Sequence, residues 1–525
     1  MTNDQDDQMS NDVIDHCDNI IDEDDFSIVP RNHASSDIGP VFLEGVLHDI
    51  PPSQDTAPLI NQRSLYLQED LEKRLSSISF TFELSKDILA DGDNAPSALG
   101  YTLYEYCKRV LAELKVVEYN GTQTRHVCYS APGTTIRVQL YTLNTAERVS
   151  EEGSILPQAE IMRLPNVRFS DRWDELVFEE DHKREVIRIV TNILRFSQPS
   201  SQGSDDADMS PIIMLHGPPG TGKTSLCEAL AQKISIRLSQ TYNMTSLVQI
   251  KSATLLSKYF SESAKVIEEV FTKLAQMCQE KPDEFLCVLI DEVESLAMSR
   301  DTSTRQGECH DSLRAVNALL TGLDRTKGYR NIIFLCTSNM IGFIESAFLD
   351  RCGLLLAINH PSPASQYAIL RGKIRKLIDR KRVYSEEDIP YYDEALVDAR
   401  IANDKPGSKL LQIVELIRSN NEQSSPNRVM SGRLLAQLPG QAILRYLRQE
   451  QCDLDMLFRF MKQSLLSERG RDVPVGQSED EAESRQRIEA GSIGRKRKIH
   501  LIIEEPNEED LEDCKRFLRT MRHKQ

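Results

Sequence analysis

A short loop between an apolar stretch and a helical stretch constrains the fold of this chain more than any other feature. Ile212–Leu215 predicts a strand before the loop, and Ser225–Ile234 predicts a helix after it. Glycines let backbone N–H groups turn inward around a phosphate, and a helix start adds partial positive charge. The loop fits the phosphate-binding pattern G-x-x-x-x-G-K-T through Gly217, Pro218, Pro219, Gly220, Thr221, Gly222, Lys223 and Thr224. We therefore expect Lys223 to reach the β- and γ-phosphates of a nucleotide and the Thr224 hydroxyl to bind Mg²⁺.

Polar residues after two later apolar stretches fit the chemistry of nucleotide hydrolysis. Leu286–Ile290 predicts a strand that leads directly into Asp291 and Glu292. We expect Asp291 to hold Mg²⁺ through water and Glu292 to polarise the attacking water as a general base. Asn339 follows a further predicted strand, Ile332–Thr337, and can orient the same water. The alternative for Asn339 is a turn residue that only caps its strand.

Two arginines are candidates for contact with the nucleotide. Arg351 follows Asp350, and its planar, permanently charged guanidinium could neutralise charge on the γ-phosphate of a neighbouring subunit. Arg433 stands at the start of a predicted helix and could report the state of the nucleotide through movement of that helix. For each arginine taken alone, an ordinary surface position is the alternative.

A short loop with aromatic residues follows the second predicted strand of the nucleotide domain. It contains Lys258, Tyr259 and Phe260. Exposed aromatic side chains on such a loop could grip a polypeptide without regard to its sequence. Core packing at a helix start is the alternative.

The middle of the chain predicts three folded segments. Residues 66–162 contain alternating and helical patterns and no catalytic cluster, which indicates a small α+β recognition domain. In residues 163–360, short apolar strands alternate with helices, so we expect an α/β domain with a parallel sheet covered by helices on both faces. Residues 361–468 predict a helical lid.

The two ends of the chain predict no packed core. Residues 1–65 are rich in Asp and poor in apolar residues, and no Lys or Arg precedes Arg31, so we expect an acidic disordered tail. Residues 469–525 form a charged tail. Its basic cluster Arg495–Lys498 fits either a nuclear import signal or a solvated turn.

Composition excludes several classes of function. The net charge of −18 argues against general binding to nucleic acid, and no apolar run approaches the length of a membrane span. The 11 cysteines include no C-x-x-C pair, which indicates reduced thiols rather than disulfides or zinc ligands. The acidic start does not fit a secretory signal.

Together these motifs resemble the AAA+ ATPases, and longer runs resemble the pachytene checkpoint protein 2 homologues among them. Trp173, with Leu176 and Val177, resembles the family segment that lies ahead of the phosphate loop, near the adenine. The resemblance covers roughly residues 75–468. The runs that carry it are Leu215–Cys227, Phe260–Ser263, Val288–Leu296, Arg314–Leu320 and Ser431–Arg433 with Leu438 and Pro439.

The resemblance implies a homohexameric ring that uses ATP and Mg²⁺, with residues 66–162 as an adaptor- and substrate-binding domain. It implies that the ring threads HORMA-domain proteins of the meiotic chromosome axis and the spindle checkpoint, directly or through a HORMA adaptor, and converts their closed form to the open one. Glu292 would drive hydrolysis, Asn339 and Arg433 would be sensors, and Tyr259 would be a pore residue. Binding to membranes or to specific nucleic-acid sequences is not expected.

The resemblance also implies a location in the nucleus and on chromosomes, with some cytoplasmic pool. One departure from the family concerns Arg351, because Cys352 and Gly353 follow it where relatives often have a small residue and an acid. Two other functions stay open from the sequence. One is an AAA+ motor of the severing, membrane-fusion or unfoldase type with a different protein substrate, and the other is a non-enzymatic scaffold that binds ATP to order a ring.

Overall fold

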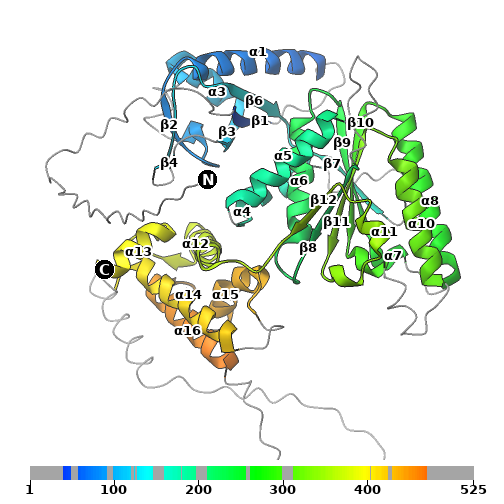
Figure 1. Cartoon of the computed structure of the whole chain (residues 1–525). Helices are drawn as coiled ribbons and strands as arrows, with labels where there is room; N and C mark the ends of the chain where they lie inside the picture. Colours follow the sequence, from blue (N-terminus) through cyan, green and yellow to red (C-terminus); the bar gives the residue numbers. More distant parts are fainter. Residues whose placement is uncertain are drawn as a thin grey trace, which may run out of the picture. The chain divides into compact units, whose positions relative to one another are not determined.

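A computed structural model gives the fold of the chain (Figure 1). The tails predicted before residue 40 and after residue 469, with the basic cluster Arg495–Lys498, lie outside the described residues. The residues that the structure describes are 40–48, 57–90, 99–119, 123–124, 127–145, 156, 159–178, 180–196, 210–255, 260–297, 311–401, 404–423 and 429–469.

A six-stranded sheet carries the phosphate loop, in the order β12-β8-β11-β10-β9-β7. The pairs β12–β8, β8–β11, β11–β10 and β10–β9 are parallel, as the sequence predicts, and β7 pairs antiparallel with β9 at the edge. Since the carboxyl ends of parallel strands meet at one edge, the loops after β8, β10 and β11 lie together. The strands are β7 (Ala159–Leu164), β8 (Ile212–His216), β9 (Met244–Lys251), β10 (Glu284–Asp291), β11 (Ile332–Ser338) and β12 (Leu354–Ala357).

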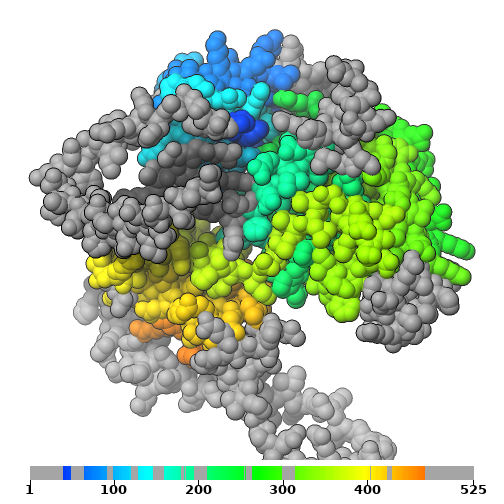
Figure 2. All heavy atoms as spheres, in the orientation of Figure 1, coloured from blue at the N-terminus to red at the C-terminus, as the bar shows by residue number. Residues whose placement is uncertain are grey.

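Helices cover both faces of this sheet (Figure 1). Alternate residues of the buried strands feed two separate cores, as Val288 and Leu289 of β10 do. One core contains α8 (Phe260–Glu280) and α10 (Asp311–Thr326), and the other contains α5 (Glu180–Phe196) and α6 (Lys223–Arg237). In the space-filling view, green and yellow-green atoms of these elements form a closely packed body (Figure 2).

Strand β7 corrects the predicted boundary between residues 162 and 163, which falls inside it. Leu164 and Met162 are buried against the nucleotide domain, while Arg163 between them is exposed. An edge strand of this kind shows the same alternation as the strands of the preceding domain, so the pattern alone does not separate them.

The N-terminal domain corrects a second prediction, that residues up to 65 are disordered. Strand β1 (Val41–Leu47) is the central strand of a sheet in the order β3-β1-β6. Its Val41 and Leu43 are fully buried. The acidic first forty residues dominate the average composition of the predicted tail. One short apolar strand is not visible in such an average. The other strands of that sheet are β3 (Leu111–Glu118) and β6 (Ile136–Tyr141).

The rest of this domain is a second sheet, in the order β2-β5-β4, and helices α1 and α3. Helix α3 ends at Val110, because the chain passes directly into β3 at Leu111. The elements are α1 (Ala57–Ser76), β2 (Phe80–Glu83), α3 (Tyr101–Val110), β4 (Gln123–Thr124) and β5 (Val127–Ser130).

A helical lid with its own apolar core follows the sheet. It begins at Pro363 and ends at Arg469, close to the predicted limits of 361 and 468. The Ser362 and Ser431 hydroxyls cap two of its helices, since each accepts a hydrogen bond from a backbone N–H of the first turn. The elements are α12 (Pro363–Asp379), β13 (Val383–Tyr384), α13 (Tyr392–Ile401), α14 (Pro406–Gln423), α15 (Gly432–Tyr446), β14 (Cys452–Asp453) and α16 (Leu454–Arg469).

Two expectations from composition can be compared with the described residues. None of the helices in those ranges combines the length and the apolar character that a bilayer crossing needs. The cysteines of the same ranges form no disulfide.

The burial of β1 predicts a cost for shortening its side chains. Leu43→Ala removes a fully buried side chain and should lower the free energy of unfolding of the N-terminal domain by about 2–5 kcal/mol. Urea unfolding, monitored by hydrogen exchange of the backbone amides in β3 and β6, measures this free energy. The control is Leu65→Ala on α1, where the side chain is 50% exposed and the expected cost is under about 0.5 kcal/mol. Equal unfolding midpoints for the two variants would contradict the position of β1.

Candidate nucleotide site

The phosphate loop joins β8 to α6 and lies against the segment that leads to the lid. Gly217 has φ +143°, and a Cβ there would lie 2.1 Å from the carbonyl oxygen of Ile358. Gly220 has φ +76°, and a Cβ there would lie 2.6 Å from the hydroxyl of Ser431 in the lid. Only glycine fits at these two positions, since both the backbone angle and the space exclude a side chain. The loop is therefore packed against both the lid and the hinge, which is the segment around Ile358 that leads to the lid.

Lys223 ties the phosphate loop to the tip of strand β11. Its ammonium donates hydrogen bonds to the carbonyl oxygens of Gly217 (2.8 Å) and Pro218 (2.7 Å) and to Oδ1 of Asn339 (2.8 Å). Burial lowers the pKa of Lys223, and the nearby charge of Arg433 acts in the same direction, while Glu294 and Asp291 oppose them. The structure thus brings together the predicted phosphate lysine and the predicted strand-tip residue.

Thr224 and Asp291 meet in the way that the predicted magnesium site requires. The Thr224 hydroxyl donates to Oδ1 of Asp291 at 2.8 Å, and the Thr337 hydroxyl donates to the same oxygen. Mg²⁺ prefers such oxygen ligands and is often held by one or two carboxylates together with nucleotide phosphates. The Thr224 hydroxyl and the Asp291 carboxylate therefore fit a Mg²⁺ ion that would be bound together with a nucleotide.

Glu292 stands in an unusual backbone conformation next to this pair. Its φ of 55° and ψ of 52° are left-handed, which is uncommon for a non-glycine residue and concentrates at functional sites. Its N–H donates to the Thr337 hydroxyl at 3.1 Å, which holds the turn. The side chain is exposed, and no hydrogen bond to its carboxylate occurs within the described ranges. Its role as the general base stays a prediction.

Glu294 is a site residue to which the sequence analysis assigned no role. Its Oε1 accepts the backbone N–H of Asn339 at 3.0 Å, while its Oε2 is buried without a hydrogen-bond partner. Its charge is also the largest of those that raise the pKa of Lys223. The hydrogen bond from Asn339 to Glu294 therefore holds the tip of strand β11 in place. Glu294 lies in the single turn η3 (Val293–Ser295), directly after Glu292 and Val293, and only its contact with Asn339 shows its place in the site.

The predicted lid sensor lies within reach of the loop. The backbone N–H of Arg433 donates to the carbonyl oxygen of Gly220 at 2.9 Å, and the Arg433 side chain is exposed. The charge of the Arg433 guanidinium lowers the pKa of Lys223, so the guanidinium acts electrostatically on the lysine of the phosphate loop. Its role as a sensor stays a prediction.

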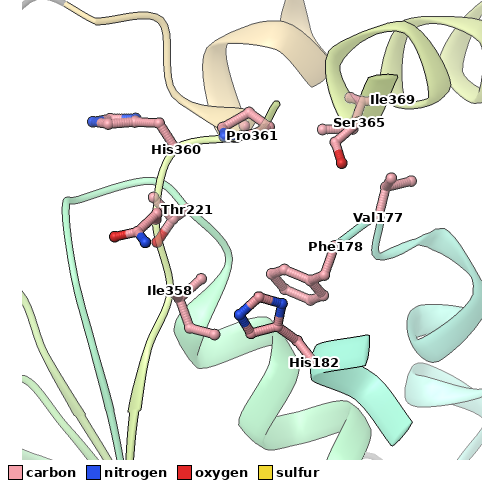
Figure 3. Close-up of a pocket in the computed structure, with 11 residues that line it drawn as sticks. Val177, Phe178, His182, Thr221, Ile358, His360, Pro361, Ser365 and Ile369 are labelled. Carbon is pink, nitrogen blue, oxygen red and sulfur yellow. The ribbon is translucent and has the colours of Figure 1, made fainter. Parts of the chain in front are cut away.

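A pocket of about 500 Å³, including its open mouth, lies beside the phosphate loop (Figure 3). Apolar side chains contribute much of its wall, with a few polar groups among them, as is typical of sites for a nucleotide base. In the close-up, Val177 and Phe178 face Ser365 and Ile369 of α12 across the pocket. The lining residues are Val177, Phe178, His182, Thr221, Ile358, Asn359, His360, Pro361, Ser365, Ile369 and Gly432.

Two of the three residues predicted near the adenine, Trp173 and Leu176, do not line this pocket. Trp173 is buried in the core, with the Lys183 ammonium 5.4 Å from the centre of its ring. Leu176 packs against the same core, beside Gly222. Val177, the third residue of the predicted segment, does line the pocket, together with Phe178, which follows it directly and was not predicted.

Two other predictions stay predictions. Lys258 and Tyr259 lie outside the described residues, and of Phe260 only its place at the start of α8 is described. Arg351 is not among the residues that line the pocket or influence the pKa of Lys223. It pairs instead with Asp324 of α10.

Comparison with known proteins finds relatives over more than half of the chain. Residues 213–359 match the family model described as "ATPase family associated with various cellular activities (AAA)". The pachytene checkpoint protein 2 homolog of Xenopus tropicalis is 35% identical over 317 residues, which cover 60% of this chain and 71% of that protein. The human homolog is 35% identical over 309 residues, which cover 58% and 69%.

A solved structure of PCH-2 from Caenorhabditis elegans has the same fold. It aligns with a TM-score of 0.61 and 23% identity, over 82% of this chain and all of that one. The sequence matches therefore carry the assignment to a family, and this structural match supports the fold.

The contact between Gly220 and the lid predicts that a single methyl group disturbs nucleotide binding. Gly220→Ala should weaken ATP binding by about tenfold or more, since it clashes with Ser431 and strains the loop backbone. Titration with a fluorescent ATP analogue measures the affinity. Gly342→Ala is the control, because a Cβ there meets no heavy atom within 4 Å. Equal affinities for the two variants would contradict the described loop geometry.

Proposed function

Because the chain belongs to the pachytene checkpoint protein 2 family of AAA ATPases, we propose that it uses ATP hydrolysis to remodel HORMA-domain proteins. The observation that carries the proposal is that Lys223, Asn339, Thr224 and Asp291 meet at one sheet edge, and that the phosphate loop contacts the lid through Gly220. Membership in the family supports the choice of client. The proposal includes HORMA proteins of the meiotic chromosome axis and the spindle checkpoint, reached in the nucleus and on chromosomes.

The residues of the site divide the chemical work among them. Lys223 would leave the carbonyl oxygens of its own loop to bind the β- and γ-phosphates of ATP. Thr224 and Asp291 would hold Mg²⁺, which neutralises charge on the phosphates when it is bound. Glu292 would take a proton from the attacking water, and Asn339, held by Glu294, would orient that water.

The same contacts suit the transfer of a local change to the rest of the molecule. The loop touches the lid through Gly220 and Arg433, and the pocket is lined from both the sheet and the lid. A ligand shifts such an equilibrium only through contacts that differ between two states. Loss of the γ-phosphate would change the contacts of Lys223 and Arg433 and so bias the position of the lid.

Helix α6 also connects the site to the N-terminal domain. It begins at Lys223, and near its other end Lys233 and Arg237 form ion pairs with Glu44 of β1 and Glu118 of β3. The Lys233–Glu44 pair is buried, so removal of one partner would leave an uncompensated charge. We propose that this domain holds the HORMA client or its adaptor and that α6 links it to the nucleotide.

The active form in this proposal is a homohexameric ring. Arg351 would act on the nucleotide of a neighbouring subunit, and Lys258, Tyr259 and Phe260 would contact the client in the pore. Exposure of Arg351 away from the pocket of its own chain fits an action between subunits.

Substitution of the general base tests both the chemistry and the client. Glu292→Gln should bind ATP with near wild-type affinity and lose about 10²- to 10⁴-fold in turnover, because the amide cannot accept the proton. The variant should also hold its clients on a pull-down with ATP, where HORMA-domain proteins are expected by mass spectrometry. Glu269→Gln is the control, an exposed glutamate on α8.

Two outcomes would contradict separate parts of the proposal. Turnover by Glu292→Gln near the wild-type rate would remove its role as base. Capture of other polypeptides without any HORMA-domain protein would instead favour an AAA motor with a different client.

A further inference from the structure

Arg351 is held in one orientation by its own subunit. It follows α11 (Ser346–Leu349), and its Nε and Nη2 donate to Oδ1 and Oδ2 of Asp324, both at 2.8 Å. Its Nη1 donates to the carbonyl oxygen of Ala347 at 2.6 Å. This two-point pair with a carboxylate fixes the plane of the guanidinium as well as its position.

The pairing leaves one edge of the guanidinium available. An arginine has five N–H groups, and the contacts with Asp324 and Ala347 use three of them. One N–H remains on Nη1 and one on Nη2, and the described part of the chain supplies no further partner for either. Two N–H groups on one planar edge match two oxygens of a phosphate group.

The surroundings of the pair indicate that this edge serves another molecule. The side chains of Arg351 and Asp324 are 32% and 52% exposed. The hydrogen bond from Arg351 lowers the pKa of Asp324, so the carboxylate stays ionised at neutral pH. An exposed ion pair of this kind contributes little to the stability of the folded chain, so stability does not account for its two-point geometry.

We propose that Asp324 is a positioning residue that presents the free edge of Arg351 to the γ-phosphate bound by a neighbouring copy of the chain. The inference rests on the proposed ring. A long arginine side chain at a surface otherwise samples many rotamers, and the carboxylate removes most of that freedom before the neighbour arrives. Asp324 itself touches no nucleotide in this arrangement.

Asp324→Asn is the first test, because asparagine keeps the size of the side chain and loses one acceptor oxygen. We expect kcat for ATP to fall about 10- to 100-fold, the effect of a small misplacement of a catalytic group. The dissociation constant for ATP, measured by calorimetry, should stay unchanged. Arg351→Ala should lose about 10³-fold or more in kcat. The control is Asp388→Asn, which breaks an exposed Asp–Arg pair in the lid, with Arg375, and should not change kcat.

Mixed rings separate positioning from a structural defect. Glu292→Gln subunits cannot hydrolyse ATP but keep the Asp324–Arg351 pair intact, while Asp324→Asn subunits keep an intact nucleotide site. Mixing the two should therefore raise turnover per Asp324→Asn subunit, at junctions where an intact Arg351 faces an active site. A mixture of wild-type and Glu292→Gln subunits provides the baseline, and Arg351→Ala mixed with Glu292→Gln should show the same rescue.

The outcomes distinguish the inference from the function on which it rests. Rescue of Arg351→Ala, together with wild-type kcat in Asp324→Asn, overturns the positioning role and leaves the ring function in place. Loss of kcat in Asp324→Asn without rescue in mixed rings assigns Asp324 to the structure of its own subunit and also overturns the inference. Wild-type turnover by Arg351→Ala removes the action of Arg351 between subunits and with it this part of the proposed function.

Discussion

The hydrogen bonds of the Lys223 ammonium hold the site together. One cation links two carbonyl oxygens of the phosphate loop to the side chain of Asn339 on a neighbouring strand. Burial weakens its charged form, while the carboxylates of Glu294 and Asp291 favour it. The positive charge of Lys223 therefore lies where it could bind a phosphate. The loop keeps its shape through hydrogen bonds of the ammonium that a phosphate could replace.

The backbone of the phosphate loop, more than its side chains, connects the site to the lid. Gly217 lies directly against the hinge at Ile358, and Gly220 lies against the cap of α15. Close contacts of this kind have little room to adjust, because a packed interior changes between discrete arrangements rather than deforming smoothly. A shift of the loop by a few tenths of an ångström must therefore move the lid or be resisted by it.

Sequence alone identified what is local and missed what depends on long-range pairing. The phosphate loop, Asp291, Glu292 and Asn339 come from short motifs, and β8 begins at the predicted Ile212 and ends at His216, one residue beyond the predicted Leu215. Strands β1 and β7 gain their places only through partners distant in the chain, at β3 and β9. Glu294 and Phe178 were missed for the same reason, since the value of each side chain lies in what it meets across the fold.

A carboxylate beside a catalytic arginine raises the question of whether it cancels the charge that the arginine supplies. Asp324 binds the Nε–Nη2 edge, so its carboxylate lies to one side of the free N–H groups on Nη1 and Nη2 and not between them and a bound phosphate. Attraction between charges falls with distance and is weak where water screens it, as it is around this exposed pair. A phosphate in direct contact with the free edge would exclude that water and interact more strongly. Orientation therefore costs little of the electrostatic effect, and a pair that adds little to the stability of the folded chain can still set the rate of a reaction between two chains.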